Sequence, residues 1–228
     1  MVVKVCGIRT PEIAECAIEA GADWLGLVFE PRSPRHVEDA AAEAVRQAVA
    51  GRADLVGVMV APSAERCREL SRRHRLAAVQ VHGPVEPRLV TEVDVTVIRA
   101  INPPDARAAL VVEWWPDCPL LLDSPPARPE ALPGGTGLRL DLALAAEVAA
   151  HRRVILAGGL TPDSVAEAIG RVRPWGVDAS SGLESQPGVK DPGRVRDFVV
   201  AAREAFERLA EAGRAMNGGP AAVAEAVG

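Results

Sequence analysis

The stretch Val154-Ile155-Leu156-Ala157-Gly158-Gly159-Leu160-Thr161-Pro162 contains a complete strand-to-helix transition. Its apolar start is typical of a buried parallel strand, which the two glycines then interrupt. The segment leads directly into a helical pattern that begins at Pro162, where the first turn offers free N–H groups. The same order of strand, turn and helix recurs along most of the chain, which indicates a fold made of repeated βα units.

Eight segments have the composition of buried parallel strands: each is four to seven residues long, rich in Val, Ile and Leu, and bounded by Gly, Pro or Asp. The predicted strands are Val2–Cys6, Trp24–Phe29, Leu55–Val60, Ala78–His82, Val95–Ile101, Leu120–Asp123, Val154–Gly158 and Gly176–Ala179. The clearer predicted helices are Pro11–Ala20, Glu38–Ala50, Ser63–His74, Leu142–His151, Pro162–Gly170 and a last one from Asp191 to Ala212. The helices after the fourth and fifth strands are the weakest, because prolines interrupt their pattern.

Such a repeat fits either a closed barrel or a doubly wound open sheet. No Gly-x-Gly-x-x-Gly follows the first strand, which argues against the dinucleotide-binding form of the open sheet. We therefore predict one α/β domain, a single (β/α)8 TIM barrel over residues 1–212. The Gly- and Ala-rich segment 213–228 is predicted to be a frayed, partly disordered extension outside the barrel.

The composition narrows the possible partners. The 228 residues carry a formal net charge of −5 at pH 7, whereas a nucleic-acid partner requires a concentrated basic face. No segment approaches the roughly 20 apolar residues of a membrane span. Charged residues appear by Lys4 and Arg9, where a signal peptide would be apolar. We expect a cytoplasmic protein that binds neither nucleic acid nor membrane, as a monomer or a homodimer.

The cysteines and histidines give no metal or disulfide pattern. The four cysteines are widely separated in the chain: Cys6, Cys16, Cys67 and Cys118. No Cys-x-x-Cys or His-x-x-x-His spacing is present, so we expect neither a metal site nor a disulfide scaffold. Lysine is rare, since Lys4 and Lys190 stand beside 24 arginines. A lysine kept against that bias suggests a task that arginine cannot perform.

The active sites of such barrels lie at the C-terminal ends of the strands. By alternation Lys4 and Cys6 lie on the same side of the first strand. If both face inward, the cation below Cys6 would favour its thiolate and suit it to be a general base. A small apolar filler is the alternative role for Cys6. Asp123 closes an apolar run, where burial would raise its pKa and suit it to donate a proton, although a turn residue is also consistent with the following prolines.

Two glycine-containing loops follow the seventh and eighth strands, the recurrent phosphate-binding place of these barrels. They contain Gly158-Gly159 and Ser181-Gly182, and each can bring backbone N–H groups close to a phosphate. The run Gly135-Thr136-Gly137 precedes the seventh strand and could close over the same ligand. Arg35 follows the second strand and could grip a second anionic group through a bidentate fork, or remain a solvated loop cation.

In their order, these motifs resemble those of phosphoribosylanthranilate isomerases, (β/α)8 enzymes of tryptophan biosynthesis. The matching stretches run from residue 4 to about 191: Lys4-Val5-Cys6-Gly7-Ile8-Arg9, Gly21-Ala22-Asp23, Gly26-Leu27-Val28-Phe29, Ser33-Pro34-Arg35, Val79-Gln80-Val81-His82-Gly83, Leu121-Leu122-Asp123-Ser124, Gly134-Gly135-Thr136-Gly137, Leu156-Ala157-Gly158-Gly159-Leu160, Ser180-Ser181-Gly182-Leu183-Glu184 and Gly188-Val189-Lys190-Asp191. Each stretch is modest alone, and the ordered set is highly specific.

The resemblance implies an Amadori rearrangement of N-(5-phosphoribosyl)anthranilate to a 1-deoxyribulose 5-phosphate, without a cofactor. It implies that Asp123 is the general acid, Cys6 the general base, and Arg35 the ligand of the anthranilate carboxylate. Backbone amides near Gly159, Ser181 and Gly182 would hold the phosphate. The full set of implied substrate-binding residues is Lys4, Arg35, His82, Gly135, Gly137, Gly158, Gly159, Asp178, Ser181 and Gly182.

The chain departs from the family pattern after the Gly-Thr-Gly run, where Leu138-Arg139-Leu140-Asp141 replaces a lysine followed by an aromatic residue. Arg139 could supply the missing cation if the loop shifts by one residue. Pro84 also displaces an acidic residue that often follows the Gln-x-His-Gly stretch. Two alternatives therefore stay open: an isomerase acting on another N-glycosyl ribose 5-phosphate, and a non-catalytic phosphate-binding barrel.

Overall fold

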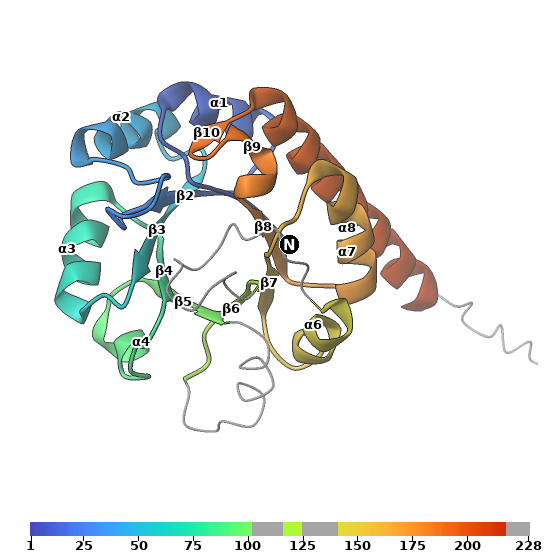
Figure 1. Cartoon of the computed structure of the whole chain (residues 1–228). Helices are drawn as coiled ribbons and strands as arrows, with labels where there is room; N and C mark the ends of the chain where they lie inside the picture. Colours follow the sequence, from blue (N-terminus) through green and yellow to red (C-terminus); the bar gives the residue numbers. More distant parts are fainter. Residues whose placement is uncertain (102–115, 125–140, 218–228) are drawn as a thin grey trace, which may run out of the picture.

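The computed structural model describes residues 1–101, 116–124 and 141–217, and in it eight parallel strands close into a barrel in the order β1 to β8 (Figure 1). The barrel strands are β1 (Val2–Cys6), β2 (Trp24–Val28), β3 (Asp54–Val60), β4 (Ala78–His82), β5 (Thr96–Ile101), β6 (Leu120–Leu122), β7 (Val154–Leu156) and β8 (Gly176–Ala179). The helices around it are α1 (Pro11–Glu19), α2 (Asp39–Val49), α3 (Ala64–His74), α4 (Leu89–Glu92), α6 (Leu142–Ala149), α7 (Pro162–Val172) and α8 (Pro192–Asn217). The predicted (β/α)8 barrel is confirmed.

Helix starts follow from local sequence. The Thr10 side chain accepts a hydrogen bond from the Ile13 N–H, and Pro11 occupies the first turn of α1. Asp141 caps α6 in the same way, accepting from two backbone N–H groups of its first turn. At α7 the Thr161 and Ser164 side chains form a reciprocal capping box. These caps place helix N-termini immediately after the strand-end loops, where the candidate site lies.

Side chains of alternate strand positions fill the barrel interior. Its apolar layer consists of Val56, Ala78, Ile98, Ala100, Leu121, Ile155 and Ala157. Trp24 and Trp175 pack against this layer at the N-terminal ends of β2 and β8, with ring centroids 5.5 Å apart in an edge-to-face arrangement. A larger apolar cluster fills the space between the strands and the surrounding helices. The apolar layer leaves polar side chains at the opposite, C-terminal end of the barrel.

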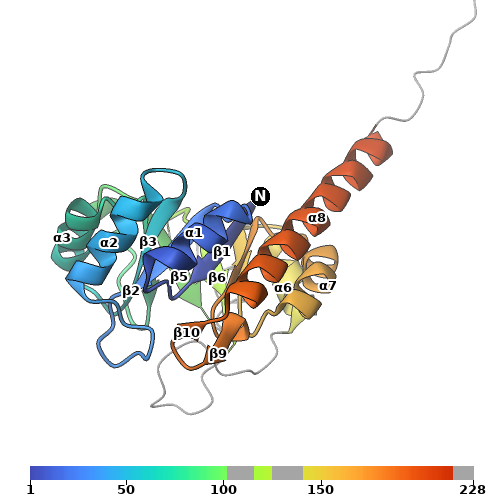
Figure 2. The same ribbon diagram turned by 90° about the horizontal axis from the view of Figure 1, so that it is seen from above.

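Helix α8 is longer than predicted. It continues to Asn217 rather than ending at Ala212, and Figure 2 shows its C-terminal part projecting beyond the barrel. Its last turns are rich in Ala, Glu and Arg, so the single Gly213, which costs only about 1 kcal/mol in a helix, does not stop it. The predicted extension therefore starts inside a helix, and residues 218–228 lie outside the described part of the chain. No helix among the described residues is long and apolar enough to cross a membrane.

A short hairpin follows β8 that the sequence reading did not anticipate. After the 3-10 turn η1 (Ser181–Leu183), the strands β9 (Glu184–Gln186) and β10 (Val189–Lys190) pair antiparallel before α8 begins. Gly188 turns the chain with a positive φ of 82°. A Cβ at this position would collide with the carbonyl oxygen of Pro34, so the hairpin packs directly against the loop after β2.

Candidate active site

A pocket opens at the C-terminal ends of the barrel strands. Its lining includes residues from β1, β2, β3, β4, β6 and β8 and from the loops that follow β2, β6, β7 and β8. Among the predicted site residues, the pocket is lined by Cys6, Arg35, His82, Asp123, Gly158, Gly159, Asp178 and Ser181. Lys4 is fully buried beneath it, as its position one layer below Cys6 requires. Among the described residues, no cluster of three or more His, Cys, Asp or Glu side chains could hold a metal ion.

Lys4 and Asp178 form an ion pair inside the barrel. They are register partners on the neighbouring strands β1 and β8, and Lys4 Nζ lies 3.0 Å from Asp178 Oδ2. Burial lowers the pKa of Lys4, but the nearby Asp178 and Cys6 outweigh it and raise the pKa above its ordinary value. Within the described residues, Asp178 Oδ1 has no hydrogen-bond partner. That oxygen is therefore available to a polar group of a ligand in the pocket.

Cys6 is the last residue of β1 and is only 6% exposed. A Cβ on Gly26 would lie 2.9 Å from Cys6 Sγ and 3.2 Å from Lys4 Nζ, so this glycine makes room for both side chains. Lys4 favours the thiolate as predicted, because its charge lowers the pKa of Cys6, but it does not decide the net shift. Burial raises the pKa of Cys6 by more than Lys4 and Lys190 lower it. Cys6 is consequently mainly a thiol at neutral pH, with a minor thiolate fraction that Lys4 favours.

Asp123 directly follows β6 and is 6% exposed. Burial raises the pKa of its carboxyl to about 6, although a hydrogen bond from the Ser124 N–H to Oδ1 at 2.8 Å acts in the opposite direction. The predicted rise is confirmed, and it leaves about a tenth of Asp123 protonated at pH 7. Going round the barrel, β7 and β8 separate β6 from β1, so Asp123 and Cys6 border one pocket from different strands.

His82, at the end of β4, contacts Gln80 on the same side of the strand. The Gln80 amide nitrogen donates to His82 Nε2 at 2.8 Å, which leaves the ring hydrogen on Nδ1. Burial, with the nearby cations Lys4 and Arg99, lowers the pKa of His82 to about 3. His82 is thus a neutral hydrogen-bonding group in the pocket rather than a cation. Gln80, which also lines the pocket, was not predicted as a site residue.

The loops after β7 and β8 lie against each other. Gly158 and Gly159 have φ values of 83° and 76°, and a Cβ on Gly158 would lie 2.7 Å from the Ser124 backbone nitrogen. A Cβ on Gly182 would collide with the carbonyl oxygen of Leu160. The glycines therefore allow one compact double loop, with Gly158, Gly159 and Ser181 in the pocket wall and Gly182 behind it.

Part of the predicted site cannot be placed. Gly135 and Gly137 lie outside the described residues. The same holds for 138–140, the segment that departs from the family pattern. Their assigned contacts with the ligand stay predictions.

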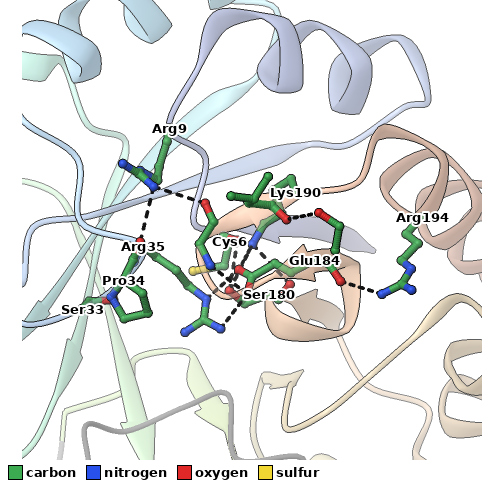
Figure 3. A network of polar contacts seen from close by, with 12 residues as sticks. Cys6, Arg9, Ser33, Pro34, Arg35, Ser180, Glu184, Lys190 and Arg194 are labelled. Carbon is green, nitrogen blue, oxygen red and sulfur yellow. Dashed lines mark hydrogen bonds and ion pairs between the residues drawn. The ribbon is translucent and has the colours of Figure 1, made fainter.

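Arg35 is not a free loop cation. Its Nε and Nη2 donate to Glu184 Oε1 and Oε2 at 2.7 and 2.8 Å, and Lys190 Nζ donates to Glu184 Oε1 at 2.6 Å (Figure 3). The bidentate fork expected for a ligand is thus made to a protein carboxylate. Burial raises the pKa of Glu184, but the bonds from Arg35 and Lys190 outweigh it and hold the pKa below its ordinary value.

Glu184 and Lys190 were assigned no role from the sequence, although both stand in motifs that carried the resemblance. One signal was present: Lys190 is one of only two lysines in an arginine-rich chain. The partner of Lys190 could not be read from spacing, because the hairpin that joins it to Glu184 has no hydrophobic period. The contact of Glu184 with Arg35 spans 149 residues.

Comparison with known proteins agrees with this geometry. The family model for N-(5'phosphoribosyl)anthranilate (PRA) isomerase matches residues 3–201. A curated relative of that name from Roseiflexus castenholzii is 45% identical over 215 residues, covering 90% of this chain and 99% of the relative. Another from Trichlorobacter lovleyi is 40% identical over 205 residues, covering 90% of this chain and 98% of the relative.

Solved structures give the same assignment. Phosphoribosyl anthranilate isomerase from Thermotoga maritima has a TM-score of 0.80 and 34% identity, covering 90% of this chain and 100% of that one. A structure of the isomerase in complex with reduced 1-(o-carboxyphenylamino)-1-deoxyribulose 5-phosphate has a TM-score of 0.77 and 32% identity, with the same coverage. A further Thermotoga maritima structure, of monomers generated from the dimeric isomerase, has a TM-score of 0.76 and 32% identity, again covering 90% and 100%. The resemblance carried by the ordered motifs is confirmed: this chain belongs to the N-(5'-phosphoribosyl)anthranilate isomerase family.

Proposed function

We propose that this chain catalyses the Amadori rearrangement of N-(5-phosphoribosyl)anthranilate to 1-(2-carboxyphenylamino)-1-deoxyribulose 5-phosphate in tryptophan biosynthesis. The observation that carries the proposal is the position of Asp123 and Cys6 in one pocket, beside a double glycine loop and an arginine. An aldose-to-ketose conversion needs one acid and one base at different ends of a small ligand. Family membership narrows the ligand to this substrate.

In the first step the protonated form of Asp123, which burial favours by raising the pKa to about 6, donates its proton to the furanose ring oxygen. The bond between C1 and the ring oxygen breaks, and the anthranilate nitrogen becomes part of a Schiff base. Cys6, as the thiolate, then removes the C2 proton and the electron pair moves towards the nitrogen. The enolamine that results tautomerises to the ketone. Substrate and product are isomers, so the atoms and electrons balance without an external oxidant or reductant.

The residues around the pair provide binding. The phosphate is assigned to the double loop of Gly158, Gly159 and Ser181, where backbone N–H groups and the start of α7 favour an anion. The anthranilate carboxylate is assigned to Arg35. Asp178 and His82, which line the pocket, are assigned to hydroxyl groups of the sugar between these two ends.

The fully buried Lys4 lies below the base, where its charge favours the Cys6 thiolate against the opposing effect of burial. Its role in the proposal is electrostatic support. A Schiff base between Lys4 and the substrate is disfavoured, because its nitrogen lies beneath the pocket and pairs with Asp178.

We infer that the enzyme works in the cytoplasm as a monomer or a homodimer, on a free small molecule. A dimeric relative from Thermotoga maritima makes the homodimer the form to test first. Sedimentation equilibrium of the full chain distinguishes the two.

The experiment that tests the function is steady-state turnover on freshly prepared phosphoribosylanthranilate, followed by the loss of its fluorescence. We expect saturable turnover, strongly reduced by Cys6→Ser or Asp123→Asn. Growth of a bacterium lacking this isomerase on tryptophan-free medium gives the same answer in the cell. No rate above the uncatalysed background would contradict the assignment. Phosphate binding that persists with unchanged turnover in both variants would show that the catalytic pair is wrong.

A further inference from the structure

Burying the Glu184 carboxylate costs free energy, so the contacts that offset this cost indicate a role for the residue. It is 7% exposed, and a carboxylate can be buried at this level only when it is paired. Its two oxygens accept from Arg35 and Lys190, and Oε2 also accepts from the Gly188 N–H at 3.2 Å. The one carboxylate thus accepts hydrogen bonds from three segments: the loop after β2, the hairpin turn and β10.

The cluster packs on the backbone beside Cys6. A Cβ on Gly7 would lie 3.0 Å from Arg35 Cδ, 3.1 Å from Lys190 Nζ and 3.3 Å from Ser180 Oγ. Lys190 Nζ donates to the Ser180 carbonyl oxygen at 3.2 Å, and Ser180 Oγ donates to the Cys6 carbonyl oxygen at 3.1 Å. The position of Arg35 is therefore coupled through short contacts to the strand end that carries Cys6.

The charges of the cluster do not cancel. Arg35 and Lys190 contribute two positive charges and Glu184 one negative charge, so one positive charge remains. Lys190 is 7% exposed and Arg35 lines the pocket, so the surplus charge faces the ligand space more than bulk water. Glu184 binds Nε and Nη2 of Arg35. Figure 3 shows the other terminal nitrogen, Nη1, pointing away from this network.

We propose that Glu184 is a positioning residue: it holds the Arg35 guanidinium by two bonds so that Nη1 is presented to the carboxylate of the substrate, while Lys190 supplies the cation that keeps the cluster positive. The long arginine side chain loses rotamer entropy when it is fixed, and holding its plane in advance removes part of that cost from binding. The inference rests on the proposed function, because it takes Arg35 to be the carboxylate ligand.

Geometry and charge predict opposite results for Glu184→Gln. Removing the negative charge makes the pocket more positive, so a purely electrostatic role predicts tighter binding of an anionic ligand. Loss of the positioning bonds predicts weaker binding, because the amide can accept from only one of the two guanidinium nitrogens and Arg35 regains freedom. The amide has nearly the same size as the carboxylate, so the substitution separates these two effects.

The test uses two ligands on the full-length enzyme: reduced 1-(o-carboxyphenylamino)-1-deoxyribulose 5-phosphate and the same compound without its carboxylate. Titration calorimetry gives Kd for each ligand with the wild type and with Glu184→Gln. We expect Glu184→Gln to weaken the carboxylate-bearing ligand about tenfold, as for loss of one charge-assisted contact, and the other ligand by less than about twofold. In turnover, KM should rise by the same factor while kcat changes little.

Equal weakening of both ligands would overturn the proposal, since it would mean a general structural role. Tighter or unchanged binding of the carboxylate-bearing ligand would overturn it as well. If the wild type itself does not distinguish the two ligands, Arg35 is not the carboxylate ligand and both this inference and that part of the proposed function fail. If the wild type distinguishes them but Glu184→Gln has no selective effect, only this inference fails.

Glu43→Gln is a matched control. Glu43 also holds an arginine by two bonds, from Arg46 Nε at 2.7 Å and Nη2 at 2.6 Å, but on helix α2 and away from the pocket. This variant should leave both ligand affinities unchanged. If Glu184→Gln does not fold, Glu184→Asp keeps the charge but withdraws the carboxylate by one methylene, and it should show the same selective loss for the carboxylate-bearing ligand.

Discussion

Two buried charge clusters lie next to Cys6, and they are built differently. The inner pair, Lys4 and Asp178, joins two neighbouring strands through their register and has no net charge. The outer cluster of Arg35, Glu184 and Lys190 joins a loop to a hairpin and keeps one positive charge. The difference indicates two separate roles. The inner pair lies beneath the proposed base, Cys6, whereas the outer cluster offers a cation to the ligand.

The largest expected effect comes from the proposed acid, Asp123, which borders the same pocket as both clusters. Asp123→Asn removes the proton donor but keeps the size of the side chain, so we expect kcat/KM to fall by about 10²–10⁴-fold. Steady-state kinetics on phosphoribosylanthranilate measures this loss. A fall of less than about fivefold would mean that another group protonates the ring oxygen.

Breaking the inner pair should damage stability most. Lys4→Met leaves Asp178 buried without its counter-ion, which should lower the free energy of unfolding by about 3–5 kcal/mol. Urea denaturation measures the change. The double variant Lys4→Met with Asp178→Asn should recover part of the loss, because no uncompensated charge then remains. A double variant less stable than Lys4→Met alone would contradict this account of the pair.

Breaking the outer cluster should lower the free energy of unfolding by less. In Lys190→Met the Glu184 carboxylate keeps both bonds from Arg35, so we expect a loss of about 1.5–3 kcal/mol in the free energy of unfolding. The same denaturation experiment checks this value. A loss equal to that of Lys4→Met would contradict the expectation that the outer cluster, whose carboxylate keeps other partners, contributes less to stability than the inner pair.

The comparison of the two clusters also explains which parts of the site could be predicted from the sequence. Lys4 lies on a strand whose alternation places it on the same side as Cys6, one layer below it, and the structure shows that this side faces inward. Asp123 could be predicted because an acidic residue that ends an apolar strand lies at the barrel mouth. The strands agree with the structure to within about two residues, since their apolar runs are short and sharply bounded.

Other features depend on three-dimensional contacts that no local pattern encodes. Glu184 meets Arg35 only because the β9–β10 hairpin folds back over the loop after β2. The net shift in the pKa of Cys6 also depends on the three-dimensional fold. The adjacent cation, Lys4, is visible in the sequence, whereas the burial that outweighs it is a property of the closed barrel.

The pH dependence of kcat/KM tests the central claim most directly, because the mechanism needs Asp123 protonated and Cys6 ionised at once. Below pH 6 Asp123 is protonated and the thiolate fraction rises with pH, so the rate should rise. Between about pH 6 and the raised pKa of Cys6, loss of protonated Asp123 offsets the gain in thiolate and gives a plateau; above that pKa the rate should fall. In Asp123→Asn the bend near pH 6 should disappear. A wild-type profile that is level or falling from pH 5 to 6, or a bend that survives in Asp123→Asn, would contradict the assignment of Asp123 and Cys6 as acid and base.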